Sequence, residues 1–137
     1  MKTKKLILIV SICICTNVYG KNVKYYCDEI ARYFVGAKKP EEIYNTVAEK
    51  RSLISKEKWI IRIKGNELSV KTKGIEEMGF VPWVMHRIED DIHGSSIIGG
   101  LSVSNKSFVL NSKSLSMTVT DAVEYFTWVH FFECMSD

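Results

Sequence analysis

The chain has 137 residues, of which 46% are hydrophobic and 11% aromatic, a composition typical of a globular protein and not of a disordered one. It carries 19 basic and 16 acidic residues. Three of the basic residues (Lys2, Lys4 and Lys5) lie within the first twenty positions, which contain no acid, so the remaining 117 residues carry 16 charges of each sign. This balance excludes an electrostatic basis for binding nucleic acid or an anionic membrane surface.

The first twenty residues have the pattern of an export signal. The basic start precedes an apolar segment, Leu6 to Cys15, which is too short to span a bilayer as a helix. A cleavage pattern ends at Gly20, so we expect residues 21–137 to form a single mature domain with no stable membrane insertion. An uncleaved membrane anchor and a lipid attached to Cys13 or Cys15 are the alternatives.

The cysteines predict a disulfide. Cys13 and Cys15 leave with the signal, and Cys27 and Cys134 remain near opposite ends of the mature chain. An even number of cysteines in an exported protein favours a bridge, and this one would close a loop of about 107 residues, worth up to about 4.7 kcal/mol. Two free buried thiols are the alternative. The predicted location is periplasmic or secreted.

The first half of the mature chain contains one ambiguous segment, one predicted helix and one predicted hairpin. Lys24 to Val35 has spacings that fit a helix, but its aromatic residues favour a strand. Ala37 to Ser55 is the best helix candidate, with Pro40 at a first-turn position, and a long polar loop is the alternative. Lys58 to Thr72 alternates on both sides of Gly65-Asn66, which predicts a tight hairpin.

The second half predicts further strands. Phe80 to Ile88 predicts a strand, which Pro82 either confines to a sheet edge or starts after the proline, and a polar loop follows over residues 89–95. Residues 96–104 predict a strand interrupted by two glycines. Residues 107–120 then alternate on both sides of a polar turn, which predicts a strand, a turn and a strand.

The last apolar segment, Asp121 to Cys134, allows two interpretations. Asp121 and Glu124 have the spacing of a helix capping box. The aromatic and β-branched content that follows favours a strand. In that strand one face would carry Phe126, Trp128, His130, Phe132 and Cys134.

Together these segments predict a mainly β protein. We expect a single antiparallel sheet, strongly curved or barrel-like, with one or two short helices.

Few side chains form a pattern that could carry chemistry. The segment HRIEDDIH, from His86 to His93, holds metal-ligand residue types but crosses a strand end and a loop, so we interpret it as a solvated acidic turn and predict no metal site or cofactor. His130 is interpreted as a hydrogen-bonded core histidine. No serine lies in a nucleophile motif, so we predict a protein that is not an enzyme.

The tryptophans are the best candidates for binding. Trp59 and Trp128 lie in alternating or wholly apolar segments, so we expect them in the core. Trp83, beside Pro82, is the one that we expect to be partly exposed. Trp83 and Met85 are therefore the predicted binding residues.

The layout resembles a group of small, largely uncharacterised exported bacterial proteins. The shared features are Tyr25-Tyr26-Cys27, the hairpin from Trp59 to Val70, the segment from Phe108 to Met117 and a cysteine near the C-terminus. A glycine is common two residues before that cysteine, where this chain has Phe132. The shape is also similar in outline to small periplasmic β-barrel inhibitors of lysozyme, but their inhibitory loop motif does not occur here.

Three functions follow as ranked hypotheses. The first is an exported non-enzymatic binding protein, such as an inhibitor or immunity protein, with an envelope or secreted protein as its partner. The second is a carrier that encloses a small apolar ligand within the curved sheet. The third is a metal-dependent enzyme that uses His86, Asp90 and His93.

Overall fold

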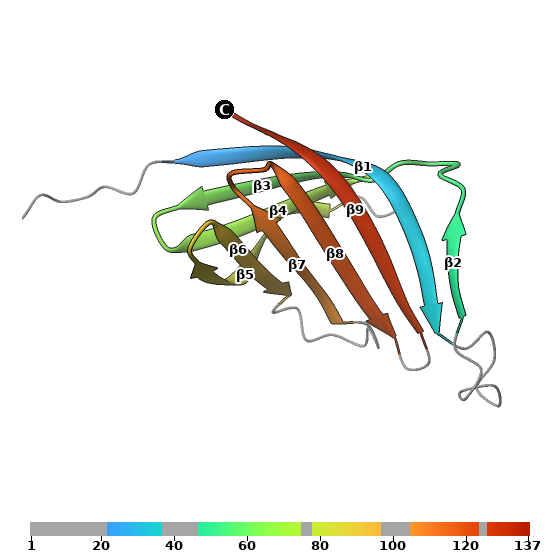
Figure 1. Cartoon of the computed structure of the whole chain (residues 1–137). Coiled ribbons are helices and arrows are strands. Elements are labelled where there is room, and N and C mark those ends of the chain that lie inside the picture. The colour runs from blue at the N-terminus through green and yellow to red at the C-terminus, as the bar shows by residue number, and fades with distance from the viewer. Residues whose placement is uncertain (1–21, 37–46, 75–77, 97–104, 124–125) are drawn as a thin grey trace, which may run out of the picture.

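The computed structural model describes residues 22–36, 47–74, 78–96, 105–123 and 126–137. The described residues form nine strands and no helix (Figure 1): β1 (Val23–Gly36), β2 (Val47–Arg51), β3 (Lys58–Lys64), β4 (Glu67–Lys73), β5 (Met78–Ile88), β6 (Asp91–Ser96), β7 (Asn105–Asn111), β8 (Ser116–Val123) and β9 (Phe126–Ser136). Accordingly, no helix in these ranges is long and apolar enough to cross a membrane.

The strands form a closed antiparallel barrel. Each strand from β3 to β8 pairs with the next strand in the chain, and β1 pairs with both β3 and β9, which closes the ring. β2 lies outside this ring and pairs with the second half of β1. The prediction of a strongly curved or barrel-like antiparallel sheet is therefore confirmed.

The predicted helix over Ala37 to Ser55 is wrong where the structure describes it. Val47–Arg51 is strand β2, which pairs with Arg32–Gly36 of β1. This half of β1 has no pairing with β3, so β2 supplies the hydrogen-bonding partner that the exposed edge needs. Tertiary pairing here overrides the local helix pattern. Residues 37–46 lie outside the described part of the chain.

The predicted hairpin is confirmed. β3 and β4 pair from Lys58 opposite Lys73 to Lys64 opposite Glu67, with the turn at Gly65-Asn66. Every second side chain along both strands is buried. The apolar core that such alternation builds contains Tyr25, Cys27, Trp59, Ile61, Ile63, Leu68, Val70, Trp83, Ile92, Phe108, Leu110, Met117, Val119, Phe132 and Cys134.

The polar loop predicted over residues 89–95 is wrong, because Asp91–Ser96 is strand β6. A two-residue turn at Glu89-Asp90 joins it to β5, and Ile92 and Gly94 face the core. Gly94 lies opposite Phe108, and a Cβ atom at this position would overlap the Phe108 ring. The glycine is thus a packing requirement for the aromatic core and not a loop signal. The strand predicted over residues 96–104 lies, beyond Ser96, outside the described ranges.

The two strand interpretations near the ends are confirmed. Lys24 to Val35 lies within β1, and Phe126 to Cys134 of the last apolar segment lie in β9, whereas Asp121 to Val123 are the end of β8. His130, Phe132 and Cys134 of β9 are buried, while Phe131 and Glu133 between them are exposed. Alternate residues of β9 therefore face the inside of the barrel, as the strand interpretation predicted.

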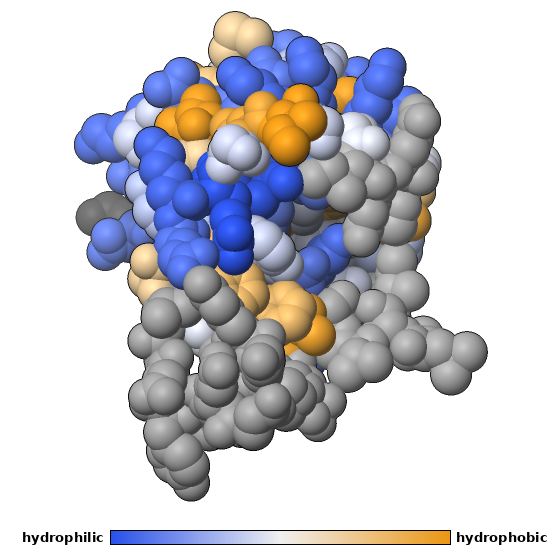
Figure 2. Space-filling model, turned by 90° about the vertical axis from the view of Figure 1, so that its right-hand side faces the viewer, coloured by the Kyte–Doolittle hydropathy of each residue, from blue (hydrophilic) through white to orange (hydrophobic). Residues whose placement is uncertain are grey.

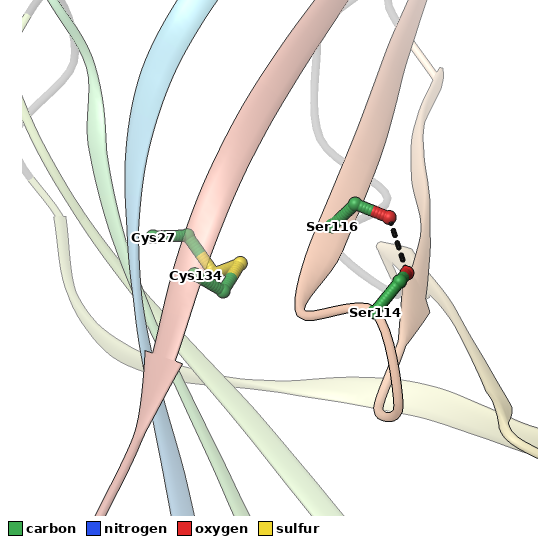
Figure 3. Close-up of a disulfide and its surroundings, with 4 residues drawn as sticks. All are labelled: Cys27, Ser114, Ser116 and Cys134. Carbon is green, nitrogen blue, oxygen red and sulfur yellow. Dashed lines mark hydrogen bonds between the residues drawn. A yellow bond between two sulfur atoms is a disulfide. The ribbon is translucent and has the colours of Figure 1, made fainter.

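A disulfide locks the strand pair that closes the barrel. Cys27 on β1 lies directly opposite Cys134 on β9, and the two are bonded across 107 residues of sequence (Figure 3). The backbone nitrogen of Cys134 also donates a hydrogen bond to the carbonyl of Leu115 at 2.8 Å. In that same turn Figure 3 shows the hydroxyls of Ser114 and Ser116 hydrogen-bonded at 2.7 Å. The last strand is therefore held on both sides.

Removing this bridge should destabilise the barrel. We expect reduction, or the double substitution Cys27→Ala and Cys134→Ala, to lower the free energy of unfolding by about 2–4 kcal/mol, because the unfolded chain regains the freedom of a long loop. Urea unfolding with and without reductant measures this change. The double variant serves as its own control, since reductant should not alter it. An unchanged midpoint in wild-type protein with two titratable thiols would contradict the prediction.

Candidate functional site

A β-bulge in β1 turns two oppositely charged side chains, Glu29 and Arg32, toward the inside of the barrel. Glu29 lies opposite Phe132 and Ala31 lies opposite Phe131, so Ile30 is an extra residue in β1. In a regular strand, residues 29 and 32 would face opposite sides of the sheet. The bulge lets Arg32 face inward with Glu29, where its Nε and Nη2 atoms donate to the two carboxylate oxygens at 2.8 and 2.6 Å.

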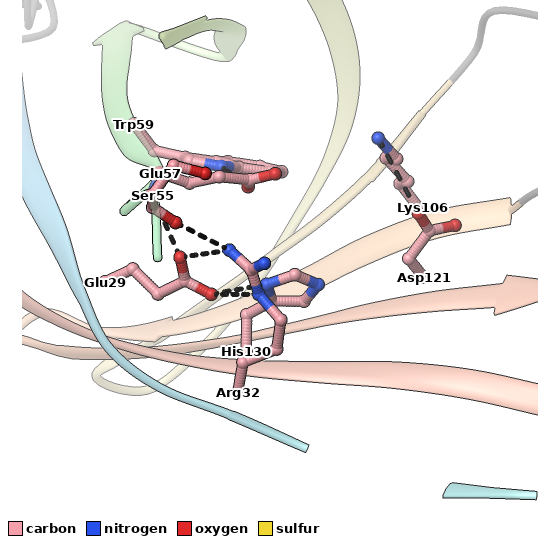
Figure 4. Close-up of polar contacts among 8 residues, drawn as sticks. All are labelled: Glu29, Arg32, Ser55, Glu57, Trp59, Lys106, Asp121 and His130. Atoms are coloured by element: carbon pink, nitrogen blue, oxygen red, sulfur yellow. Dashed lines mark hydrogen bonds and ion pairs between the residues drawn. The ribbon is translucent and has the colours of Figure 1, made fainter. Parts of the chain in front are cut away.

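The Glu29 carboxylate is fully buried and accepts hydrogen bonds from three residues (Figure 4). Besides Arg32, the backbone nitrogen of Glu57 donates to it at 2.9 Å, and Nδ1 of His130 lies at 2.7 Å. The backbone nitrogen of Glu29 in turn donates to the carbonyl of Glu57 at 3.0 Å. The paired register of β1 with β3 ends at Asp28, so the carboxylate joins the two chain segments where they separate.

These bonds keep the buried carboxyl ionised. Burial alone would raise its pKa, but the hydrogen bonds from His130, Arg32 and the Glu57 backbone outweigh burial and lower the pKa of Glu29 from 4.5 to about 2. Because the carboxylate is ionised, Nδ1 of His130 carries the proton that it donates to Glu29. The second ring nitrogen of His130 then remains for contacts on the other side.

A cavity of about 270 Å³ adjoins this cluster. Charged and aromatic side chains dominate its wall, which consists of Arg32, Glu57, Trp59, Lys106, Val119, Asp121, Trp128 and His130. Figure 4 shows Lys106 and Asp121 across from the Glu29 cluster, with the paired nitrogen and oxygen 3.7 Å apart. Figure 2 views the side of the molecule on which β2 and the end of β1 lie, and hydrophilic side chains gather near the centre of this face.

The cavity wall provides binding groups and a positioned imidazole. A carboxylate that fixes one nitrogen of a histidine is an arrangement also used by general bases. Yet none of the described residues that line the cavity carries a hydroxyl or thiol that His130 could activate. The interpretation of His130 as a hydrogen-bonded core histidine is confirmed, since it is 7% exposed and bonded to Glu29.

The residues predicted for binding do not line this cavity. Trp83 is 6% exposed and packs against Trp59 and Phe108, so the expectation that it is partly exposed is wrong. Strand parity explains the error, because Pro82 and Val84 take the outward positions of β5. Met85 is partly buried against the core.

Of the two tryptophans expected in the core, Trp59 is 2% exposed, whereas Trp128 is only partly buried because it lines the cavity. The structure thus confirms the core position of Trp59 and places Trp128 at a polar wall.

The histidines of the HRIEDDIH segment face each other across a ladder. His86 on β5 pairs with His93 on β6, and the acids Glu89 and Asp90 lie in the exposed turn between these strands. Within the described residues, no group of three or more histidine, cysteine or acidic side chains is placed to hold a metal ion. The described residues therefore offer no assembled set of metal ligands for the hypothesis of a metal-dependent enzyme that uses His86, Asp90 and His93.

Sequence reasoning missed Glu29, Arg32 and Asp121. An acid among the aromatic residues of β1, with an arginine three residues later, was a usable signal. It was not decisive, because only a bulge places both side chains on one face, and no local pattern marked Ile30 as the extra residue.

Comparison with known proteins finds no matching protein family, no matching curated protein and no matching solved structure.

The low pKa of Glu29 predicts a pH-dependent stability. The folded value of about 2 lies below the unfolded value of 4.5, so the stabilisation is fully present above about pH 4.5 and is lost as the pH falls toward 2. It amounts to about 3 kcal/mol. We expect Glu29→Gln to lower the free energy of unfolding at pH 7 by about that amount and to flatten its decline between pH 4.5 and 2, measured by urea unfolding across this range.

Asp28→Asn is the matched control. Asp28 is the neighbouring acid on the outer face, and it pairs with exposed Lys58 at 3.2 Å. Exposed pairs contribute little, so this variant should change stability by less than about 1 kcal/mol. If Glu29→Gln keeps the same decline with acid as the wild type, the pH dependence has another origin.

Proposed function

We propose that the chain is an exported, non-enzymatic binding protein that holds a small polar ligand in the cavity beside the Glu29 cluster. The observation that carries this proposal is a cavity of about 270 Å³ in which charged side chains meet two indole rings. The disulfide between Cys27 and Cys134 supports the proposed export, because such bonds persist in oxidising compartments.

The size of the barrel supports a small ligand. An eight-stranded barrel has an interior that side chains nearly fill, or that leaves room for one small molecule. Here apolar side chains such as Trp59, Phe108 and Leu110 fill much of it. The space that remains is slightly smaller than the usual range for drug-sized ligands, about 300–1,000 Å³.

The chemistry of the wall favours a polar ligand over the apolar one expected from the sequence. Ionisable side chains make up most of the lining, and Trp59 and Trp128 supply the aromatic surface. A wholly apolar ligand would displace water from charged groups without replacing its hydrogen bonds, which costs free energy. We therefore favour a ligand with its own polar groups.

A substitution that fills the cavity tests this function. Val119 on β8 lines the cavity, whereas Val109 on β7 is 38% exposed. We expect small polar compounds that raise the melting temperature and change the tryptophan fluorescence of the wild type to lose both effects in Val119→Phe, because the larger ring occupies the ligand space. Val109→Phe should retain both effects. Differential scanning fluorimetry, with native mass spectrometry for molecules that co-purify, provides the measurement.

Overpacking at Val119 is itself expected to cost about 1–3 kcal/mol, so circular dichroism must show that the variant remains folded. If no compound in the panel binds and no molecule co-purifies, the proposal fails. If a compound binds Val119→Phe as tightly as it binds the wild type, its binding site is not this cavity.

A second candidate is an inhibitor or immunity protein that binds an envelope enzyme. Its supporting observation is an apolar patch on the outer face of β1 and β9, formed by Ile30, Ala31, Tyr33, Val35, Val129 and Phe131. The rings of Tyr33 and Phe131 meet edge to face, with centroids 5.8 Å apart. Hydrophobic residues gather on the upper part of the face in Figure 2, the side where β1 and β9 lie. Such patches commonly mark protein interfaces.

A pull-down from envelope extract tests this candidate. We expect wild-type protein to recover a specific partner and Phe131→Glu to lose it, because a charge in the centre of an apolar contact would be desolvated without a pair. Val109→Glu is the matched control, since Val109 is 38% exposed and Phe131 is 37% exposed. Recovery of no specific partner by the wild type would rule out this candidate.

A further inference from the structure

The cations of the cavity are already used within the protein. Arg32 donates to both oxygens of Glu29, and its Nη2 atom also lies 3.4 Å from the carbonyl of Ser55. Lys106 lies 3.7 Å from Oδ2 of Asp121. Positive charge at this end of the barrel therefore has carboxylate partners before any ligand enters.

The carboxylates, in contrast, keep open acceptor positions. Oδ1 of Asp121 is shielded from solvent, and no residue in the described part of the chain donates a hydrogen bond to it. Glu57 accepts from Nε1 of Trp59 through Oε2 at 2.9 Å, and no described residue donates to its Oε1. A buried acceptor without a donor costs about 1–3 kcal/mol of stability. A bound molecule that donates a hydrogen bond to Asp121 would recover part of this free energy.

The balance of charge points the same way. Among the described residues, the cavity wall and Glu29 behind it contain three carboxylates (Glu29, Glu57 and Asp121) and two permanent cations (Arg32 and Lys106). Three carboxylates therefore share two permanent cations and the imidazole of His130. Trp59 and Trp128 add indole rings, whose faces attract organic cations.

From these contacts we infer that the ligand of the cavity is a small organic ammonium ion, which donates an N–H to the carboxylate of Asp121 and packs its carbon skeleton against Trp59 and Trp128. This inference rests on the proposed ligand-binding function and names the chemical class of the ligand. A quaternary ammonium would meet the charge and the indole rings but has no N–H for Asp121. The bond to Asp121 therefore distinguishes primary amines from quaternary ones.

A matched series of probes tests the inference on the disulfide-bonded protein. The probes share one carbon skeleton and differ in the head group: 2-phenylethylammonium, its N,N,N-trimethyl analogue, 3-phenylpropanoate and 2-phenylethanol. Isothermal titration calorimetry gives the dissociation constant of each. We expect the primary ammonium to bind at least about tenfold more tightly than the other three, the value of one hydrogen bond to a charged group.

Two substitutions should change this affinity in opposite directions. Asp121→Asn removes the charge and the preferred acceptor, so the ammonium should bind about tenfold more weakly or worse. Lys106→Gln removes a competing cation and leaves Asp121 in place, so the ammonium should bind more tightly. Asp28→Asn, on the outer face, should leave the affinity unchanged. Melting temperatures confirm that each variant is folded.

The outcomes separate the inference from the function on which it rests. Preferential binding of the alcohol or the carboxylate, or equal binding of the quaternary and primary ammonium ions, would overturn the ammonium inference and leave a ligand-binding cavity. Weaker binding in Lys106→Gln would also overturn it. If no probe binds and no small polar compound of any charge binds the wild type, the proposed function fails as well.

Discussion

The buried carboxylate of Glu29 is the constraint to which the closing strand of the barrel adapts. An ionised group inside a protein must have its hydrogen bonds satisfied, or burial costs several kcal/mol. The bulge at Ile30 turns Arg32 inward, Glu57 presents its backbone nitrogen, and His130 reaches across from β9. The same cluster joins β1 to the segment before β3, where the strand ladder between them has ended.

The pair of β1 and β9 therefore carries two different kinds of connection. The disulfide of Cys27 and Cys134 fixes one part of the ladder covalently, and the hydrogen bond between Glu29 and His130 fixes the next part. Both depend on the antiparallel register that closes the barrel. Because these connections hold the wall that contains Arg32 and His130, the cavity next to them has positioned side chains on at least one side.

Much of this barrel could be predicted from the sequence, because apolar and polar residues alternate along a strand and this alternation decides which side chains face inward. The hairpin of β3 and β4, the strands β7 to β9 and the disulfide all follow from alternation, turn residues and cysteine number. β2, β6 and the bulge did not follow. β2 exists because β1 lacks a partner there, Gly94 is explained by the ring of Phe108, and the bulge is visible only in the register. The candidate site depends on these three-dimensional features, so among its residues only His130 and Trp59 were interpreted correctly beforehand.

At the charged end of the barrel, some residues stabilise the fold and others are better explained by ligand binding. Buried ion pairs add little net stability compared with apolar side chains of the same size, so stability alone does not explain the charges there. Glu29, Arg32 and His130 satisfy one another and hold the wall together. Asp121 pairs with Lys106 through Oδ2, but no described residue donates to its shielded Oδ1, which lowers stability. A carboxylate with an unsatisfied oxygen at the wall of a cavity, near two indole rings, is explained when the side chain accepts a hydrogen bond from a bound molecule.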